Sequence, residues 1–165
     1  ARVFNAATRL KMNVKGLCAG FDSVSACLSK GLGAPAGTVL LGSRELIARA
    51  RRARKILGGA MRQAGILAAA GLYALENNVE RFAEDHRNAE RLASGLKAIG
   101  LPAEQHTNMV FVQIPEAKVQ PLFQHLSAHA VAVLPGPRMR LVTHLDVDAA
   151  GIDRALSAFQ HFFGN

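Results

Sequence analysis

A glycine-rich turn that carries one lysine constrains the fold of this chain more than any other feature. Apolar runs flank the turn on both sides, so we expect two buried strands, Ser23–Leu28 and Thr38–Leu41, with Lys30 between them. The glycines of the intervening segment are Gly31, Gly33 and Gly37. Glycines at such a place indicate that the backbone closely approaches another group, because they keep side chains out of the way.

The lysine itself has two interpretations. Solvated lysines are usually found on helix faces and loop tips, whereas Lys30 lies between two apolar segments. An amine held in a partly desolvated pocket loses its proton more readily and attacks carbonyl groups, which is what a Schiff base requires. The alternative is a tight β-turn-β connection with an incidental lysine, and spacing alone favours neither.

Four separated blocks of sequence resemble one enzyme family. They are Ser29–Pro35, Arg54–Ala70, His106–Val112 and Arg140–Asp146. The first closely resembles the pyridoxal-phosphate (PLP) lysine motif of the low-specificity L-threonine aldolases, which are fold-type I PLP enzymes. The other blocks continue the resemblance in the same order, and together the four extend over nearly the whole chain.

The resemblance implies an α/β fold of the PLP-dependent transferase-like, or aspartate aminotransferase-like, kind. Residues 1–85 would be the C-terminal part of the large PLP-binding domain, and residues 86–165 a small α+β C-terminal domain. In the family an Asp-Gly pair immediately precedes the Ala-Arg that opens this chain, and its aspartate holds the ring nitrogen of the cofactor. We therefore expect this chain to be about the C-terminal half of a longer enzyme, whose remainder is a separate polypeptide, was cleaved, or was left out.

The resemblance also implies a reaction and the residues that carry it. The cofactor is pyridoxal 5'-phosphate, held as a Schiff base on Lys30, and the reaction cleaves L-threonine or L-allo-threonine to glycine and an aldehyde. Cofactor binding would involve Lys30, Arg2, Lys55 and Arg62, the last two reaching a phosphate in a neighbouring subunit. Arg2 and Arg140 would hold the substrate carboxylate. The base for the β-hydroxyl proton would come from the upstream half.

The residues alone leave other interpretations open. Arg2 could be an ordinary surface arginine, and Arg140 could be a strand arginine that pairs with Asp146 or another acid. Ala60 stands where the family usually has a third glycine after Gly58 and Gly59, which makes the path of that loop less certain. The function could also be β-elimination from an aromatic amino acid on the same scaffold, or that of a non-catalytic fragment with a basic surface.

Composition narrows the classes of partner. The chain has 165 residues and a net charge of +8, yet it has no Trp and no groove-reading motif, so we expect no nucleic-acid partner. No apolar run is long enough to be a membrane span, and the histidines have no metal-site spacing. Cys18 and Cys27 do not form a disulfide framework, so we expect a reduced, cytoplasmic protein. The resemblance implies a homotetramer.

The remaining pattern predicts helices and strands along the chain. Helices are expected at Arg2–Arg9, Ser43 to the Gly58–Gly59 break, Met61–Asn77, Val79–Ile99, Lys118–His129 and Asp146–Phe162. Further strands are expected at Asn108–Ile114, Ala130–Leu134 and Met139–Thr143. The nearly uncharged helix Met61–Asn77 should be buried on almost all sides. The next helix should present Asp85 on its wet face, and Asp146 should cap the last one.

Overall fold

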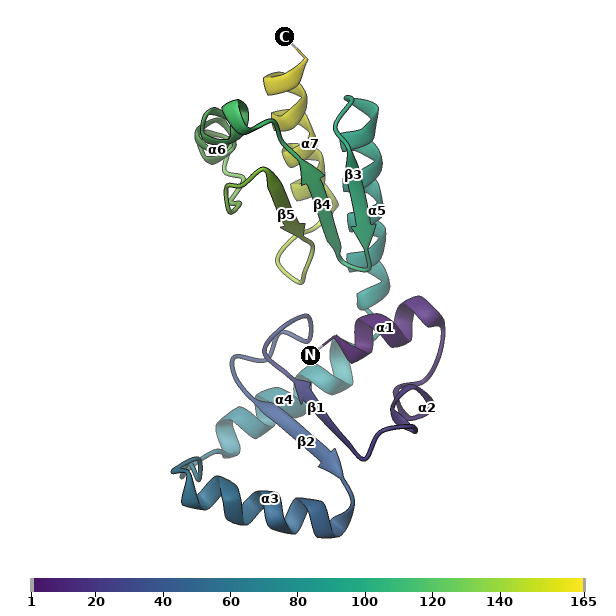
Figure 1. The fold of residues 1–165 in the computed structure, drawn as a ribbon, viewed down its shortest axis with the longest axis vertical. Coiled ribbons are helices and arrows are strands. Elements are labelled where there is room, and N and C mark those ends of the chain that lie inside the picture. The colour runs from purple at the N-terminus through teal and green to yellow at the C-terminus, as the bar shows by residue number, and fades with distance from the viewer. Residues whose placement is uncertain (1, 165) are drawn as a thin grey trace. The chain divides into compact units, whose positions relative to one another are not determined.

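The computed structural model describes residues 2–164, which form two compact units divided between Phe82 and Ala83 (Figure 1). The first unit contains α1 (Val3–Leu10), α2 (Val14–Cys18), β1 (Ser23–Cys27), β2 (Thr38–Gly42), α3 (Arg44–Ile56) and α4 (Gly65–Asn77). The second contains α5 (Phe82–Ala98), whose first residue still belongs to the first unit, β3 (Ala103–His106), β4 (Met109–Gln113), the short 3-10 helix η1 (Glu116–Lys118), α6 (Val119–Ala128), β5 (Arg138–Val142) and α7 (Ala149–Phe163).

The two strands of the first unit pair antiparallel, with Cys27 opposite Thr38 at the end nearest the turn. Their positions agree with the prediction, but their burial does not. Only Ala26 of β1 is buried, and every residue of β2 is exposed. The prediction of two buried strands is therefore wrong, because the described elements of this unit leave β2 uncovered.

The turn after β1, rather than the strands, carries the core of the first unit. The buried residues of this core are Leu28, Leu32, Ala34, Ala74 and Phe82. Phe4 and Val79 pack against them as partly buried neighbours. The core thus joins the lysine turn to the end of α4 and the first residue of α5.

Helix α4 is shorter and more exposed than its composition predicts. Gln63 takes a left-handed φ of 51°, which interrupts the helical path, so the helix begins at Gly65 rather than Met61. Of the residues in α4, only Gly71 and Ala74 are buried, while Tyr73 is 65% exposed. The prediction of burial on almost all sides is wrong because a low charge shows that a helix can be buried, not that a neighbour covers it.

Helix α3 begins and ends where the sequence predicts. The hydroxyl of Ser43 accepts a hydrogen bond from the backbone N–H of Leu46 at 3.2 Å, which caps the N-terminus. Gly58 follows the helix with a left-handed φ of 76°, a conformation that favours glycine. No residue of α3 is buried.

The second unit is built on an antiparallel sheet in the order β3-β4-β5. Alternate residues of β4 and β5 point into the core, with Val110 and Val112 fully buried and Met139 nearly so. The helices supply further large core residues, among them Leu92, Leu96, Leu122, Leu126, Ile152 and Phe159. Strand β3 was not predicted, because three of its four residues are polar and only Ala103 is buried.

Three details of the second unit correct the predictions. Ala130–Leu134 forms no strand, because Val131 donates its N–H back to Leu126 at 2.9 Å, and the prolines that follow have no N–H for a ladder. Asp148, not Asp146, caps α7 through a 2.7 Å bond from the N–H of Gly151. Asp85 is fully buried rather than on the wet face of α5.

Candidate functional site

Lys30 is exposed on the turn that leaves β1, and three backbone hydrogen bonds fix that turn. The N–H of Leu28 donates to Gly37 at 2.9 Å, that of Ala34 to Leu28 at 3.1 Å, and that of Gly33 to Lys30 at 2.7 Å. Gly33 and Gly37 have φ values of 76° and 121°, which other residues rarely adopt. The backbone that carries Lys30 is therefore fixed by hydrogen bonds. The Lys30 side chain itself is exposed among the described residues, not partly desolvated as expected.

The predicted close approach of backbone to another group occurs at Gly31. A Cβ at this position would lie 3.0 Å from Cζ of Phe82 and closer still to its Cε1. The side-chain amide of Asn78 also reaches the turn, donating to the carbonyl of Leu32 at 2.7 Å. Sequence reasoning missed both Phe82 and Asn78, which lie far along the chain from the turn.

Cys27 is a further functional group that sequence reasoning missed. Its Sγ lies 3.4 Å from Oγ of Ser29. The hydrogen bond with the Ser29 side chain is the main cause that lowers the pKa of the Cys27 thiol, and the charge of Lys30 acts in the same direction. The position of Cys27, three residues before Lys30, was the available signal.

The other predicted cofactor residues lie in the same unit as Lys30. Arg2 is half-buried and immediately precedes α1. Lys55 is exposed in the last turn of α3, and Arg62 is exposed in the segment before α4. Their roles stay predictions.

Arg140 lies in the second unit, exposed on β5 opposite Phe111. It lines a cavity of about 630 Å³ together with His144 and Arg154. Asp146, the acid that Arg140 was expected to pair with if it had only a structural role, lies instead 3.5 Å from Nδ1 of His144.

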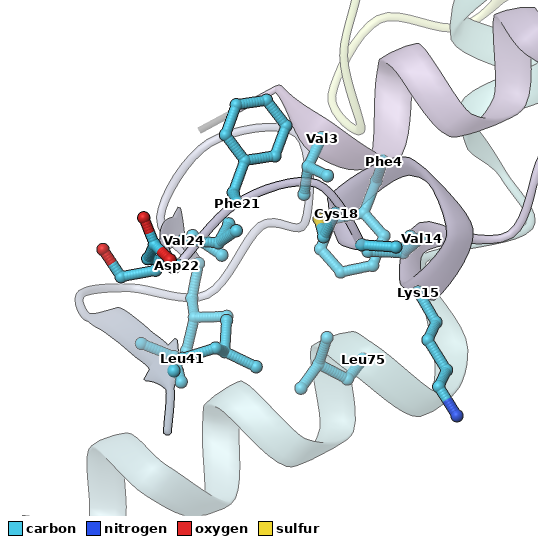
Figure 2. A pocket seen from close by; sticks show the side chains of 16 residues that line it. Val3, Phe4, Val14, Lys15, Cys18, Phe21, Asp22, Val24, Leu41 and Leu75 are labelled. Atoms are coloured by element: carbon cyan, nitrogen blue, oxygen red, sulfur yellow. The ribbon is translucent and has the colours of Figure 1, made fainter. Parts of the chain in front are cut away.

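A second cavity, of about 580 Å³, lies in the first unit and is mainly apolar (Figure 2). Its walls come from α1, α2, the two strands and Leu75 of α4. Figure 2 shows Leu41 and Leu75 pointing into this space, while the amine of Lys15 points away from it. Lys30 is not among the residues that line it, although Leu28, at the start of the lysine turn, is.

Residues 2–164 contain neither a metal-ligand cluster nor a membrane-spanning helix. No three His, Cys, Asp or Glu side chains in this range come together as metal ligands. Within the same range, no helix has the length and hydropathy needed to cross a membrane.

The donor chemistry of the lysine turn fits a pyridoxal cofactor. Such a cofactor needs a primary amine that can react with its aldehyde, and Lys30 provides one on an exposed, backbone-bonded turn. Gly31 and Gly33 place no side chains beside that amine.

Comparison with known proteins places the chain among relatives about twice its length. It is 49% identical over 148 residues to the low specificity L-threonine aldolase of Escherichia coli (strain K12), covering 89% of this chain and 44% of that protein. It is 40% identical over 169 residues to low-specificity L-threonine aldolase 1 of Arabidopsis thaliana, covering 97% and 47%. The chain thus spans about half the length of these relatives.

Solved structures confirm the predicted α/β fold class. A Listeria monocytogenes EGD-E protein, provisionally named an L-allo-threonine aldolase, superposes with a TM-score of 0.80 at 17% identity, covering 98% of this chain and 50% of that one. The neighbours include aminotransferases and other PLP enzymes of the same fold. Residues 1–117, well over half of the chain, match the beta-eliminating lyase family. With low-specificity L-threonine aldolases among its homologues, the chain belongs to the beta-eliminating lyase family.

Proposed function

We propose that the enzyme carrying this chain is a PLP-dependent carbon–carbon lyase that cleaves L-threonine, L-allo-threonine and related β-hydroxy-α-amino acids to glycine and an aldehyde. The proposal rests on the setting of Lys30. Its amine is exposed on a turn that backbone hydrogen bonds fix, and the nearby residues Leu28 and Leu32 are buried. The names of the relatives, which match this chain at 40–49% identity, support the substrate class.

Four residues of this chain would hold the cofactor. The Nζ of Lys30 would hold the aldehyde carbon of the cofactor through a C=N bond that replaces the C=O bond, with release of water. Arg2, the residue before α1, would also contact the cofactor. Lys55 and Arg62 are exposed cations that bind its phosphate, in a neighbouring subunit. When bound, PLP supplies an electron sink for the pair released as the Cα–Cβ bond breaks.

Two arginines would orient the substrate. The guanidinium groups of Arg140 and Arg2 are planar forks that bind the substrate carboxylate, which fixes the Cα–Cβ bond in the direction needed for cleavage. The amine of Lys30 then lies beside Cα and delivers the proton that completes glycine. The base that takes the β-hydroxyl proton belongs to the half of the enzyme that this chain does not carry.

The assembly and cellular role follow from the same proposal. Residues 1–85 form the C-terminal part of the PLP-binding domain and residues 86–165 the small domain. The enzyme works as a cytoplasmic homotetramer, or as an assembly with a chain that carries the N-terminal half. It has no nucleic-acid or membrane partner and serves threonine catabolism and glycine biosynthesis.

Borohydride reduction followed by peptide mass spectrometry tests the proposal directly. The complete enzyme should carry a pyridoxyl adduct on Lys30, and incubation with threonine should yield glycine and acetaldehyde. Lys30→Ala should lose the adduct and the activity, whereas Lys15→Ala, at a lysine outside the turn, should keep both. A wild-type enzyme without an adduct on Lys30 would refute the proposed function.

The family match favours a second candidate reaction, β-elimination. It would use the same lysine and cofactor but break the bond between Cβ and its leaving group. Its products from an aromatic amino acid are pyruvate, ammonia and the aromatic leaving group. Formation of these products without glycine from threonine would replace the aldolase proposal with this one.

A further inference from the structure

The lysine turn combines an exposed reactive group with buried neighbours. Lys30 is exposed, whereas Leu28, Leu32 and Ala34 are 9%, 2% and 6% exposed. Such a contrast means that the position of the amine is set by contacts of the turn backbone, not by contacts of the lysine side chain. The residues that hold the turn from outside its own sequence therefore decide where the amine lies.

Phe82 is the first of these residues. It is 2% exposed, and its ring lies so close to Gly31 that no side chain fits between them. The ring of Phe4 stacks on Phe82 with centroids 6.1 Å apart and an angle of 11° between the planes. Because Phe4 and the buried core hold the ring in place, Phe82 packs as a rigid surface against Gly31, the residue after Lys30.

Asn78 is the second. Its Nδ2 donates to the carbonyl of Leu32 at 2.7 Å across 46 positions of sequence. Its backbone N–H donates to Ala74 at 3.0 Å, so the residue is fixed to the last turn of α4. This hydrogen bond ties the turn to α4 on the C-terminal side of Lys30.

We propose that Asn78 and Phe82 are positioning residues for Lys30 in covalent attachment of the cofactor. This inference rests on the proposed function. Together they fix the backbone of residues 31 and 32 and so hold the Lys30 amine near one position. Less conformational entropy is then lost when the amine is oriented for reaction. A nucleophile displaced by about 1 Å can lose on the order of a hundredfold in rate.

The test compares neighbouring asparagines in the complete enzyme. Asn78→Ala removes the bond to Leu32, and Asn78→Asp removes the donor while keeping the shape. Asn77→Ala is the matched control, because the Asn77 amide donates to Tyr73 at 2.8 Å and not to the turn. Phe82→Leu and Phe21→Leu form a second pair, since Phe21 is 69% exposed.

The readouts are the rate constant for covalent attachment of PLP to the apoenzyme, followed by absorbance, and the thermal midpoint. Both Asn78 variants should attach the cofactor about tenfold more slowly than their control, since the loss of one part-buried hydrogen bond is worth about that factor. Phe82→Leu should slow attachment by about the same factor, because it removes the ring that packs against Gly31 and lets the turn shift. Their KM for threonine should change less than the attachment rate, because Arg140 is untouched.

The outcomes separate this inference from the proposed function. If the wild-type enzyme carries no adduct on Lys30, the proposed function fails. If the wild type reacts at Lys30 and the variants attach PLP as fast as the controls, with only a lower thermal midpoint, the residues are merely structural and the inference is overturned. Where Asn78→Ala loses the fold, Asn78→Asp and Phe82→Leu decide the matter by the same rate.

Discussion

The two units have nearly equal lengths but very different cores. In the second unit the described core holds seventeen buried apolar residues, most of them from the sheet and its three helices. In the first unit the core cluster holds five, gathered around the lysine turn. The second unit therefore has the interior of an independent small domain, and the first does not.

The unit with the smaller core exposes more large apolar residues on its surface. Most of the exposed large apolar residues belong to the first unit, and they include Phe21, Leu40, Leu41, Ile56, Leu57, Met61, Ile66, Leu72 and Tyr73. The second unit exposes Leu134 and Leu145. Lys30 thus lies on the unit whose own residues bury least, which indicates that the stability of that unit depends on further contacts.

Separating the units should give the largest effect. A fragment of residues 83–165 should unfold in urea in one cooperative transition, because its core is complete. A fragment of residues 1–82 should show no cooperative transition, because a two-stranded sheet with one uncovered strand and a five-residue core cannot offset the entropy of ordering the chain. Circular dichroism during urea titration measures both. A cooperative transition in the first fragment would remove the contrast between the units.

Matched leucine truncations should give the next largest effect. Leu122 is fully buried in the second unit, so Leu122→Ala should lower the free energy of unfolding by about 2–5 kcal/mol. Leu72 is 60% exposed on α4, so Leu72→Ala should change it by about 0.5 kcal/mol or less. Urea titrations of the whole chain provide both values. Equal losses would mean that α4 is buried in solution after all.

The same contrast explains which predictions of the fold succeeded. Capping by Ser43, the break at Gly58 and the positions of β1 and β2 depend on neighbours in sequence, and all were correct. Burial of β2 and α4 depends on which distant residues cover them, and composition does not contain that information. Strand β3 was missed because pairing with β4, rather than its own residues, makes it a strand.

The residues of the candidate site also fall into those that local sequence predicts and those that only distant contacts reveal. Lys30 could be found from its local pattern of strand, glycines and strand, together with the resemblance. Asn78 and Phe82 could not, because their contacts with Leu32 and Gly31 join positions about fifty residues apart. Their sequence surroundings give no sign of those contacts.

The buried polar network of the second unit offers a sharper test of its packing. Thr143 is 1% exposed and donates its hydroxyl to the carbonyl of Asp85 at 2.6 Å, while its carbonyl accepts from Nδ2 of Asn108 at 2.7 Å. Thr143→Val keeps the shape but leaves the Asp85 carbonyl without this donor, which should cost about 1–3 kcal/mol. Thr143→Ser should cost less, because it keeps the hydroxyl. Thermal unfolding of residues 83–165 measures both, and a larger loss in Thr143→Ser would show that methyl packing dominates.

The smallest expected effect concerns Cys27, the half-buried last residue of β1 in the first unit. A lowered pKa means that the thiolate forms at lower pH, so Cys27 should react with iodoacetamide at a lower pH than it would without the Ser29 hydrogen bond. The main cause is the Ser29 hydrogen bond, so Ser29→Ala should shift the rate profile of Cys27 to higher pH and leave that of Cys18 in place. Mass spectrometry of alkylated peptides from pH 6 to pH 10 gives both profiles. If Ser29→Ala leaves the Cys27 profile unmoved, the Ser29 hydroxyl does not stabilise the Cys27 thiolate in solution, and the side chains of the first unit are less tightly coupled than the buried network around Thr143.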